Sequence, residues 1–205
     1  MSDLTGDEEG SHAAKTALRS RLITARRALT PRDRSLLAEQ LQDQILAFVR
    51  REHPATIAAY VPVGSEPGGP DLPSVLGEHA RVLLPVLLPD NDLDWAVFTG
   101  SVAPGPRGLQ EPTGPRLGVA ALTSADLVLV PALAVDRSGN RMGRGGGSYD
   151  RALARLSGSR PLILALLHEG ELVEAVPAEP HDRPVHGVIT PRGGLTLNRA
   201  AEWTK

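Results

Sequence analysis

The sequence contains no cysteine, and this absence removes several chemistries at once. Disulfide bonds, zinc sites built on thiolates and catalysis by a cysteine nucleophile are all excluded. Lysine is scarce as well, because arginine supplies every basic residue except Lys15 and Lys205. A single lysine can arise by chance, but one at position 15 in an arginine-based chain also fits a site that needs a compact point charge.

Aromatic residues and long apolar runs are also scarce. Aromatics are 3% of the residues against 41% for all hydrophobic types, so leucine, valine, alanine and isoleucine must fill the core. No apolar run approaches the roughly 18 residues of a membrane span, and no signal-peptide pattern precedes the first helix. The net charge of −2 disfavours binding to nucleic acid. We therefore expect a cytoplasmic protein that binds neither nucleic acid nor membrane.

The length of 205 residues suits one domain. The acidic and polar segment 1–10 predicts a disordered N-terminal tail. Residues 199–205 are expected to form a C-terminal tail, which leaves 11–198 as the folded domain. We expect this domain to act as a monomer.

Short apolar runs alternate with helical patterns along the domain. Apolar spacing predicts helices over 12–29, 32–50, 71–79 and 149–156. Strands are expected at 56–61, 81–86, 93–98, 127–135, 162–167 and 185–190, with an edge strand at 195–197 and loops over 62–70, 99–118 and 172–184. This order predicts an α/β fold, a single domain of three layers in which helices cover both faces of a mostly parallel sheet. Ligands bind such sheets beyond the carboxyl ends of the strands.

The most informative segment is 128–151, where an apolar run ends in Asp136, a glycine-rich loop follows and a helix begins. Five of the nine residues from 139 to 147 are glycine, and Arg141 and Arg144 stand among them. Glycines expose backbone N–H groups, and a helix start adds partial positive charge, so this order is typical of an anion cradle. Arginine side chains add charge-assisted hydrogen bonds that suit phosphate.

The loop matches neither of the common phosphate motifs. It lacks the lysine of a GxxxxGK[ST] loop, and Ser148 stands where a GxGxxG fingerprint requires its third glycine. A flexible surface loop between strand and helix is the alternative interpretation. The two arginines, and the pair Tyr149-Asp150 at the start of the helix, favour a phosphate site.

The same segment resembles the 5-formyltetrahydrofolate cyclo-ligase family, whose pattern continues as G-x-R-x-G-x-G-x-G-Y-Y-D-R. The matching residues are Pro131, Asp136, Gly139, Arg141, Gly143, Arg144, Gly145, Gly147, Tyr149, Asp150 and Arg151. The resemblance extends from about residue 12 to about residue 191. It implies a fold like that of the sugar-phosphate isomerases and CoA-transferases. It also implies a ligase that uses ATP and Mg²⁺ to close 5-formyltetrahydrofolate to 5,10-methenyltetrahydrofolate, releasing ADP and phosphate.

The resemblance implies an ATP site built from two segments. The first helix of the family carries K-x-x-x-R near the ATP phosphates, and Lys15 and Arg19 match it. Taken without the resemblance, Lys15, Arg19 and Arg26 could form a solvated basic helix face. The glycine loop would supply the other ATP-binding residues, namely Arg141, Met142, Gly143, Arg144, Gly145, Gly146, Gly147, Ser148 and Tyr149. Arg144 and Lys15 are the expected catalytic residues, because phosphoryl transfer depends on positioning and charge neutralisation.

The resemblance places the folate beside the same loop. Its expected contacts are Val61, Glu66, Arg144, Gly145, Gly146, Gly147 and Ser148. Glu66 follows its strand as in the family, although the loop after it is altered and a solvated glutamate is the alternative. Val61 could equally belong to the core. Ser148 replaces a family tyrosine that helps to frame the folate, which is a departure from the pattern.

Two carboxylates are candidates for a magnesium site. Asp182 takes the place of a metal ligand in the family segment V-P-x-x-x-x-D-x-x-V-D, whereas His186 replaces the second aspartate. Asp150 and Asp182 could hold Mg²⁺ jointly, because this ion needs only one or two carboxylates beside phosphate oxygens and water. His181 and His186 are poor ligands for this hard ion.

Several residues and two rival functions stay open. Trp95 could flank a folate ring or pack in the core, and Glu111 is expected to be structural. Ser148 and the altered loop at Glu66 would also fit a paralogue with another substrate, in thiamine-related or other cofactor metabolism. The second rival is a non-catalytic protein that binds a phosphorylated metabolite, because one fold can serve several functions.

Overall fold

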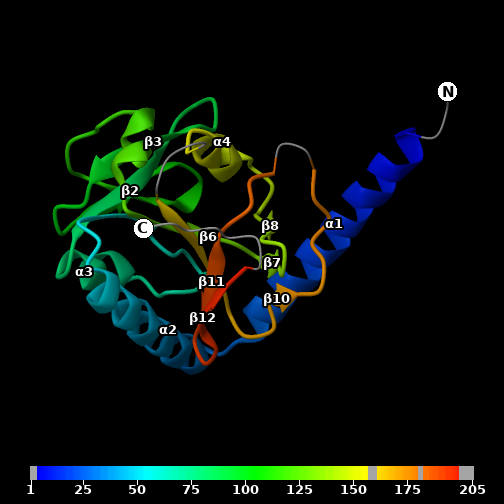
Figure 1. The fold of residues 1–205 in the computed structure, drawn as a ribbon, viewed down its shortest axis with the longest axis horizontal. Helices are drawn as coiled ribbons and strands as arrows, with labels where there is room; N and C mark the ends of the chain where they lie inside the picture. Colours follow the sequence, from blue (N-terminus) through cyan, green and yellow to red (C-terminus); the bar gives the residue numbers. More distant parts are fainter. Residues whose placement is uncertain (1–3, 157–160, 180–181, 199–205) are drawn as a thin grey trace.

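A seven-stranded sheet forms the centre of the protein in a computed structural model that describes residues 4–156, 161–179 and 182–198 (Figure 1). Its strands are β1 (Thr56–Ala58), β2 (Arg81–Leu87), β3 (Leu93–Val97), β6 (Leu127–Pro131), β9 (Leu162–Leu166), β11 (Gly187–Thr190) and β12 (Gly194–Leu197). They lie in the order β12-β11-β9-β6-β1-β2-β3. The inner neighbours are parallel, and only the edge strands β3 and β12 pair antiparallel. The predicted α/β class with a mostly parallel sheet is confirmed.

Helices α2 (Pro31–Glu52) and α3 (Leu72–Gly77) cover one face of the sheet. The start of α2 is defined locally, since the hydroxyl of Thr30 accepts a hydrogen bond from the backbone N–H of Asp33. Pro31 occupies the first helical turn, where its missing N–H costs nothing. The core of this layer joins apolar side chains of the two helices to the strands, among them Leu41, Ile45, Leu76, Ile57, Leu129 and Leu164.

The opposite face is covered by α4 (Ser148–Ala154) and the 3₁₀ segment η2 (Val119–Ser124). Leu153 of α4 and Leu122 of η2 join a second core cluster with Val130 of the sheet. The predicted three-layer arrangement therefore holds. Across the described residues, no helix is both long enough and apolar enough to cross a bilayer.

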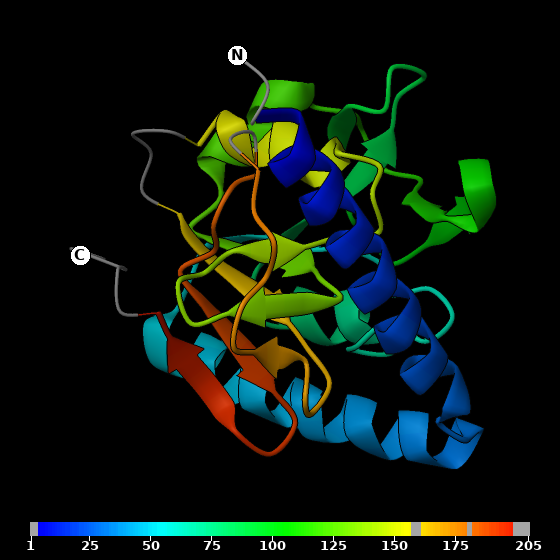
Figure 2. The same cartoon turned by 90° about the vertical axis from the view of Figure 1, so that its right-hand side faces the viewer.

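Helix α1 (Leu4–Ala28) packs on a separate three-stranded sheet rather than on the central one (Figure 2). This small sheet consists of β10 (Leu172–Val173), β7 (Ala134–Asp136) and β8 (Arg141–Met142). Leu22 of α1 contacts a cluster that includes Leu133 and Met142. The helix starts earlier than predicted, so residues 4–10 of the expected tail are helical. Residues 1–3 and the predicted tail 199–205 lie outside the described residues.

The predicted strand over 127–135 is wrong in one respect, because it is two strands in two sheets. Strand β6 ends at Pro131, and the chain then enters the small sheet, where the N–H of Leu133 donates to the carbonyl of Met142. The glycine loop therefore follows the β7–β8 hairpin rather than the central strand. The expected loop 99–118 also contains a hairpin, formed by β4 (Val102–Pro104), η1 (Pro106–Gly108) and β5 (Gln110–Pro112).

Candidate active site

A cavity of about 490 Å³ lies between the glycine loop, α1, the loop after β1 and the end of β2. Every predicted site residue lines it: Lys15, Arg19, Val61, Glu66, Arg141, Met142, Gly143, Arg144, Gly145, Gly146, Gly147, Ser148, Tyr149, Asp150 and Asp182. These residues come from four separate segments of the sequence. The fold therefore brings the expected nucleotide, folate and metal residues to one place.

The glycine loop turns sharply into α4. Gly147, the residue before the helix, has φ +68, a left-handed conformation that favours glycine. Its carbonyl accepts the first hydrogen bond of the helix, from the N–H of Arg151 at 3.1 Å. Arg144, Gly145 and Gly146 are exposed to the cavity side of this turn, so their backbone groups are accessible to a ligand.

Helix α1 is tied to the glycine loop and to the segment before β11 by its cations. The Nε of Arg19 donates to the carbonyl oxygen of Gly143 at 3.1 Å. The Nζ of Lys15 lies 2.8 Å from Asp182 and 3.2 Å from Glu179. Lys15 is buried, so the alternative of a solvated basic face is wrong at this residue.

The two candidate metal ligands each carry a cationic partner. Asp150 lies 2.7 Å from the guanidinium of Arg141, which also lies 6.0 Å from the ring centre of Tyr149. The backbone N–H of Arg183 is 3.5 Å from Asp150. Because Arg183 directly follows Asp182, the two candidate ligands belong to segments that are in contact. No group of three or more acidic, histidine or cysteine side chains that could enclose a metal occurs in the part of the chain that is described.

Glu66 and Arg144 meet at the cavity. The Nε of Arg144 lies 3.3 Å from one oxygen of Glu66, whose other oxygen accepts the N–H of Val63 at 2.9 Å. Burial, followed by the negative charge of Glu66, raises the pKa values of Tyr60 and Tyr149 above that of a free phenol. Both hydroxyl groups therefore stay protonated at neutral pH.

Comparison with known protein families agrees with the resemblance described above. The profile of the 5-formyltetrahydrofolate cyclo-ligase family matches residues 11–191. The chain belongs to this family. The resemblance predicted over residues 12 to 191 is thus confirmed.

Relatives of this cyclo-ligase family member span nearly the whole chain. A 5-formyltetrahydrofolate cyclo-ligase of Mycolicibacterium smegmatis is 40% identical over 196 residues, which cover 92% of this chain and 100% of that protein. The Escherichia coli protein of the same name is 28% identical over 171 residues, covering 81% and 94%. The structure of Aquifex aeolicus 5,10-methenyltetrahydrofolate synthetase shares the fold, with a TM-score of 0.75, 23% identity and coverage of 93% and 96%.

Sequence reasoning missed several cavity residues of this cyclo-ligase family member. Tyr60 lines the cavity and donates its hydroxyl to the carbonyl of Pro67 at 2.8 Å. Arg26 forms a buried pair with Glu171 at 2.7 Å and 2.8 Å. Tyr60 directly precedes Val61, a signal that could have found it, whereas Arg26 and Glu171 are too far apart in sequence for any motif to connect them.

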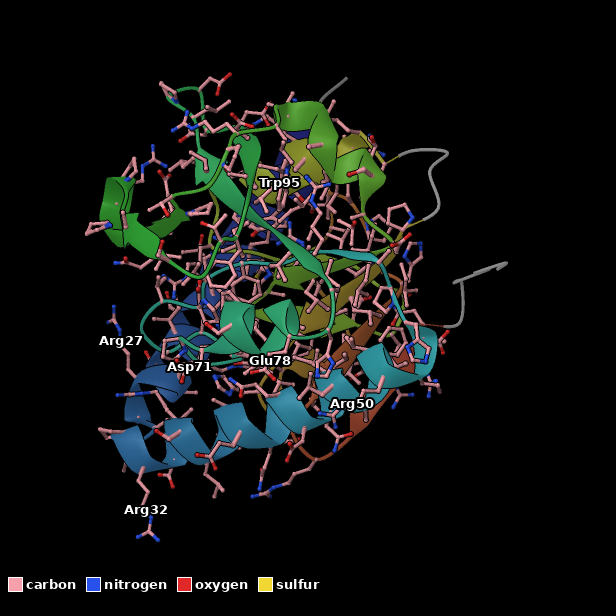
Figure 3. The ribbon with its side chains drawn as sticks, turned by 90° about the vertical axis from the view of Figure 1, so that its left-hand side faces the viewer. Arg27, Arg32, Arg50, Asp71, Glu78 and Trp95 are labelled. Atoms are coloured by element: carbon pink, nitrogen blue, oxygen red, sulfur yellow. The ribbon has the colours of Figure 1, made fainter. Side chains whose placement is uncertain are left out.

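Three further predictions have structural answers. Trp95 is fully buried in the core with Leu122 and does not line the cavity, so it does not flank a ligand (Figure 3). His186 accepts the N–H of Ile163 on Nδ1, and burial lowers its pKa, so it is a neutral link within the sheet. Glu111 accepts the N–H of Leu87 at 2.9 Å, as a structural residue would. His181 lies outside the described residues.

Proposed function

We propose that this protein couples the conversion of ATP to ADP and phosphate to the closure of 5-formyltetrahydrofolate, giving 5,10-methenyltetrahydrofolate. Membership of the cyclo-ligase family supports this reaction. The observation that most supports the proposed reaction is that one cavity is lined by Lys15, Arg19, Glu66 and Arg144. A monomeric state and a cytoplasmic location stay predictions.

The triphosphate would lie against the glycine loop and α1. The backbone N–H groups of the exposed residues 144–146 would donate to phosphate oxygens. Lys15, Arg19 and Arg141 supply positive charge around that loop, and each is already held by a carboxylate or a carbonyl oxygen. These contacts hold the cationic side chains in place before the ligand binds, which lowers the entropic cost of binding.

The donors at the metal position fit Mg²⁺. Asp150 and Asp182 are hard oxygen ligands that approach the same wall of the cavity, and magnesium needs no third carboxylate when phosphate oxygens complete its shell. These two residues would therefore hold the ion. When bound, Mg²⁺ supplies charge that neutralises the phosphate oxygens during transfer.

The chemistry requires positioning and charge more than a protein nucleophile. The formyl oxygen attacks the γ-phosphorus of ATP, and the bond to the bridging β–γ oxygen breaks to release ADP. N10 then attacks the activated formyl carbon and loses its proton, and the carbon–oxygen bond breaks to release phosphate. Arg144 reaches from the glycine loop towards Glu66, so its guanidinium is placed to stabilise the charge that moves between the two substrates.

A spectrophotometric assay tests the proposal. Methenyltetrahydrofolate should accumulate from 5-formyltetrahydrofolate only when ATP and Mg²⁺ are both present. Accumulation without ATP would contradict the proposal. Binding of ATP without any turnover of formyl-folate would favour the alternative of a paralogue that uses this loop on another substrate.

A further inference from the structure

The peptide groups on both sides of Glu66 accept hydrogen bonds from side chains that lie outside the loop between β1 and α3. The hydroxyl of Tyr60 donates to the carbonyl oxygen of Pro67 at 2.8 Å. On the other side, Nε2 of His168 lies 3.0 Å from the carbonyl oxygen of Ser65. The backbone of Glu66 is therefore fixed at both ends, which keeps its carboxylate at the cavity wall.

The ring of His168 is the donor in its contact with Ser65. A backbone carbonyl oxygen can only accept a hydrogen bond, so Nε2 carries a proton. The other ring nitrogen, Nδ1, is buried and has no hydrogen-bond partner among the residues that the structure describes. An apolar side chain would fill this buried position without leaving a polar atom unpaired. Packing alone therefore does not explain a histidine here, whereas the contact with Ser65 does.

His168 is placed to act on Glu66 without touching a ligand. Tyr60 lines the cavity and can contact a substrate itself, but His168 does not line it. His168 lies in the turn between β9 and β10, and its backbone N–H donates to Glu171 at 2.8 Å. The same carboxylate accepts hydrogen bonds of 2.7 Å and 2.8 Å from Arg26 of α1. A buried ion pair thus fixes the turn from which the imidazole reaches the loop of Glu66.

We propose that His168 is a positioning residue for the folate site, because its bond to Ser65 holds Glu66 where that carboxylate would contact the substrate. This inference rests on the proposed function, with Glu66 as a folate contact. Glu66 also lies 3.3 Å from Arg144, so its position sets the resting place of that guanidinium as well. The glycine loop, which would bind ATP, has no contact with His168 among those described.

Two replacements of His168 separate the hydrogen bond from the packing. Glutamine carries its amide nitrogen one bond further from the backbone than asparagine, so His168→Gln can still donate to Ser65 and His168→Asn cannot. We expect His168→Asn to raise KM for 5-formyltetrahydrofolate about tenfold and to leave KM for ATP within about twofold. His168→Gln should keep both values close to those of the unmodified protein.

These constants distinguish positioning from a general loss of stability. A preparation that is partly unfolded contains fewer active molecules, which lowers the apparent kcat and leaves KM unchanged. A rise in one KM therefore reports a change in the folded site. In a protein that already carries Glu66→Gln, His168→Asn should raise KM for the folate by less than about twofold, because the group that it positions has been altered.

The matched control is His79→Asn, the same replacement at an exposed histidine just after α3. This variant should keep all kinetic constants. An unchanged KM for 5-formyltetrahydrofolate in His168→Asn would overturn the inference, as would an equal rise in His168→Gln or an equal rise in KM for ATP. No turnover of 5-formyltetrahydrofolate by the unmodified protein would instead overturn the proposed function, and this inference with it.

Discussion

The guanidinium Nε of Arg144 lies 3.3 Å from a carboxylate oxygen of Glu66, and both side chains line the cavity. The two side chains differ in burial, since Arg144 is 53% exposed and Glu66 is 10% exposed. Glu66 also accepts the N–H of Val63, so its carboxylate has a second contact within the protein, whereas Arg144 is half-exposed. We propose that Arg144 exchanges Glu66 for a phosphate oxygen when ATP binds.

Replacement of Arg144 should abolish turnover without loss of the fold. We expect Arg144→Ala to lower kcat by about 10³ or more, because the guanidinium would stabilise the transferring phosphoryl group. Its side chain is half-exposed, so circular dichroism and the unfolding midpoint should change little. A rate near that of the unmodified protein would contradict the assignment.

Glu66 and Arg144 should act as a unit. We expect the effects of Glu66→Gln and Arg144→Ala on kcat/KM to be less than additive in the double variant, because the carboxylate positions the guanidinium it contacts. A double-mutant cycle measures this coupling. Strict additivity would show that the two side chains work independently.

Asp182 should control the magnesium requirement. We expect Asp182→Asn to raise the Mg²⁺ concentration for half-maximal activity by at least about tenfold, because removal of a direct ligand should cost no less than loss of a supporting one. The same substitution takes a negative charge from Lys15, which lies 2.8 Å away. Titration of activity with Mg²⁺ at saturating ATP is the measurement.

Glu179→Gln is the matched control for that titration. Glu179 also contacts Lys15, at 3.2 Å, but it is not a proposed ligand. Its magnesium dependence should stay close to that of the unmodified protein. An equal shift in both variants would mean that the effect arises through Lys15 and not through the metal.

The buried pair of Arg26 and Glu171 should matter for stability. Arg26→Met leaves the carboxylate of Glu171 buried without its cation, and we expect a loss of about 3–5 kcal/mol in the free energy of unfolding. Urea denaturation measures the change. The pair of exposed Arg51 and partly buried Glu52 provides the control, since Arg51→Ala should cost no more than about 1 kcal/mol. Similar costs at the two sites would contradict the prediction.

Asp136 should make stability depend on pH. Burial opposes its ionisation, but hydrogen bonds from Asn140, Val176 and Ser138 lower its pKa overall. A lowered folded-state pKa gives stability that is complete above the unfolded value of about 3.9 and is lost as the pH falls through the folded value. Asp136→Asn should therefore cost about 1–3 kcal/mol at pH 7, because the charged acceptor of these donors is removed.

The difference between the two proteins should shrink below about pH 4, where Asp136 is protonated in the unfolded state before it is protonated in the folded protein. Urea denaturation from pH 7 to pH 3 would measure it. Asp43→Asn, at an exposed position of α2, should leave the free energy of unfolding nearly unchanged throughout. A difference that stays constant with pH would show that the cost of Asp136→Asn is unrelated to charge.

Local sequence patterns predicted the central sheet well, because buried parallel strands are continuous apolar runs. The same rule failed at residues 127–135, since the apolar run continues where the chain passes from β6 to β7 in another sheet. Periodicity cannot detect a change of sheet when both sides are buried. The early start of α1 at Leu4 was missed because its first turns are polar.

The candidate site was predictable where residues lie close together in sequence. The glycine loop, Arg141 and Asp150 form one motif, and their contact at 2.7 Å spans only nine positions. Arg107, which also lines the cavity, was missed because the segment 99–118 was expected to be an irregular loop and instead contains a hairpin. The pairing of Arg26 with Glu171 was missed because two residues separated by 145 positions leave no local pattern.

The contacts between α1 and the rest of the cavity determine when the pocket can form during synthesis. Lys15, Arg19 and Arg26 meet partners that are 167, 124 and 145 positions later. A ribosome adding about 5–20 residues per second completes α1 several seconds before it makes Asp182. Helix α1 is therefore synthesised before its acidic partners exist. A nascent chain can form the complete pocket only when translation is almost finished.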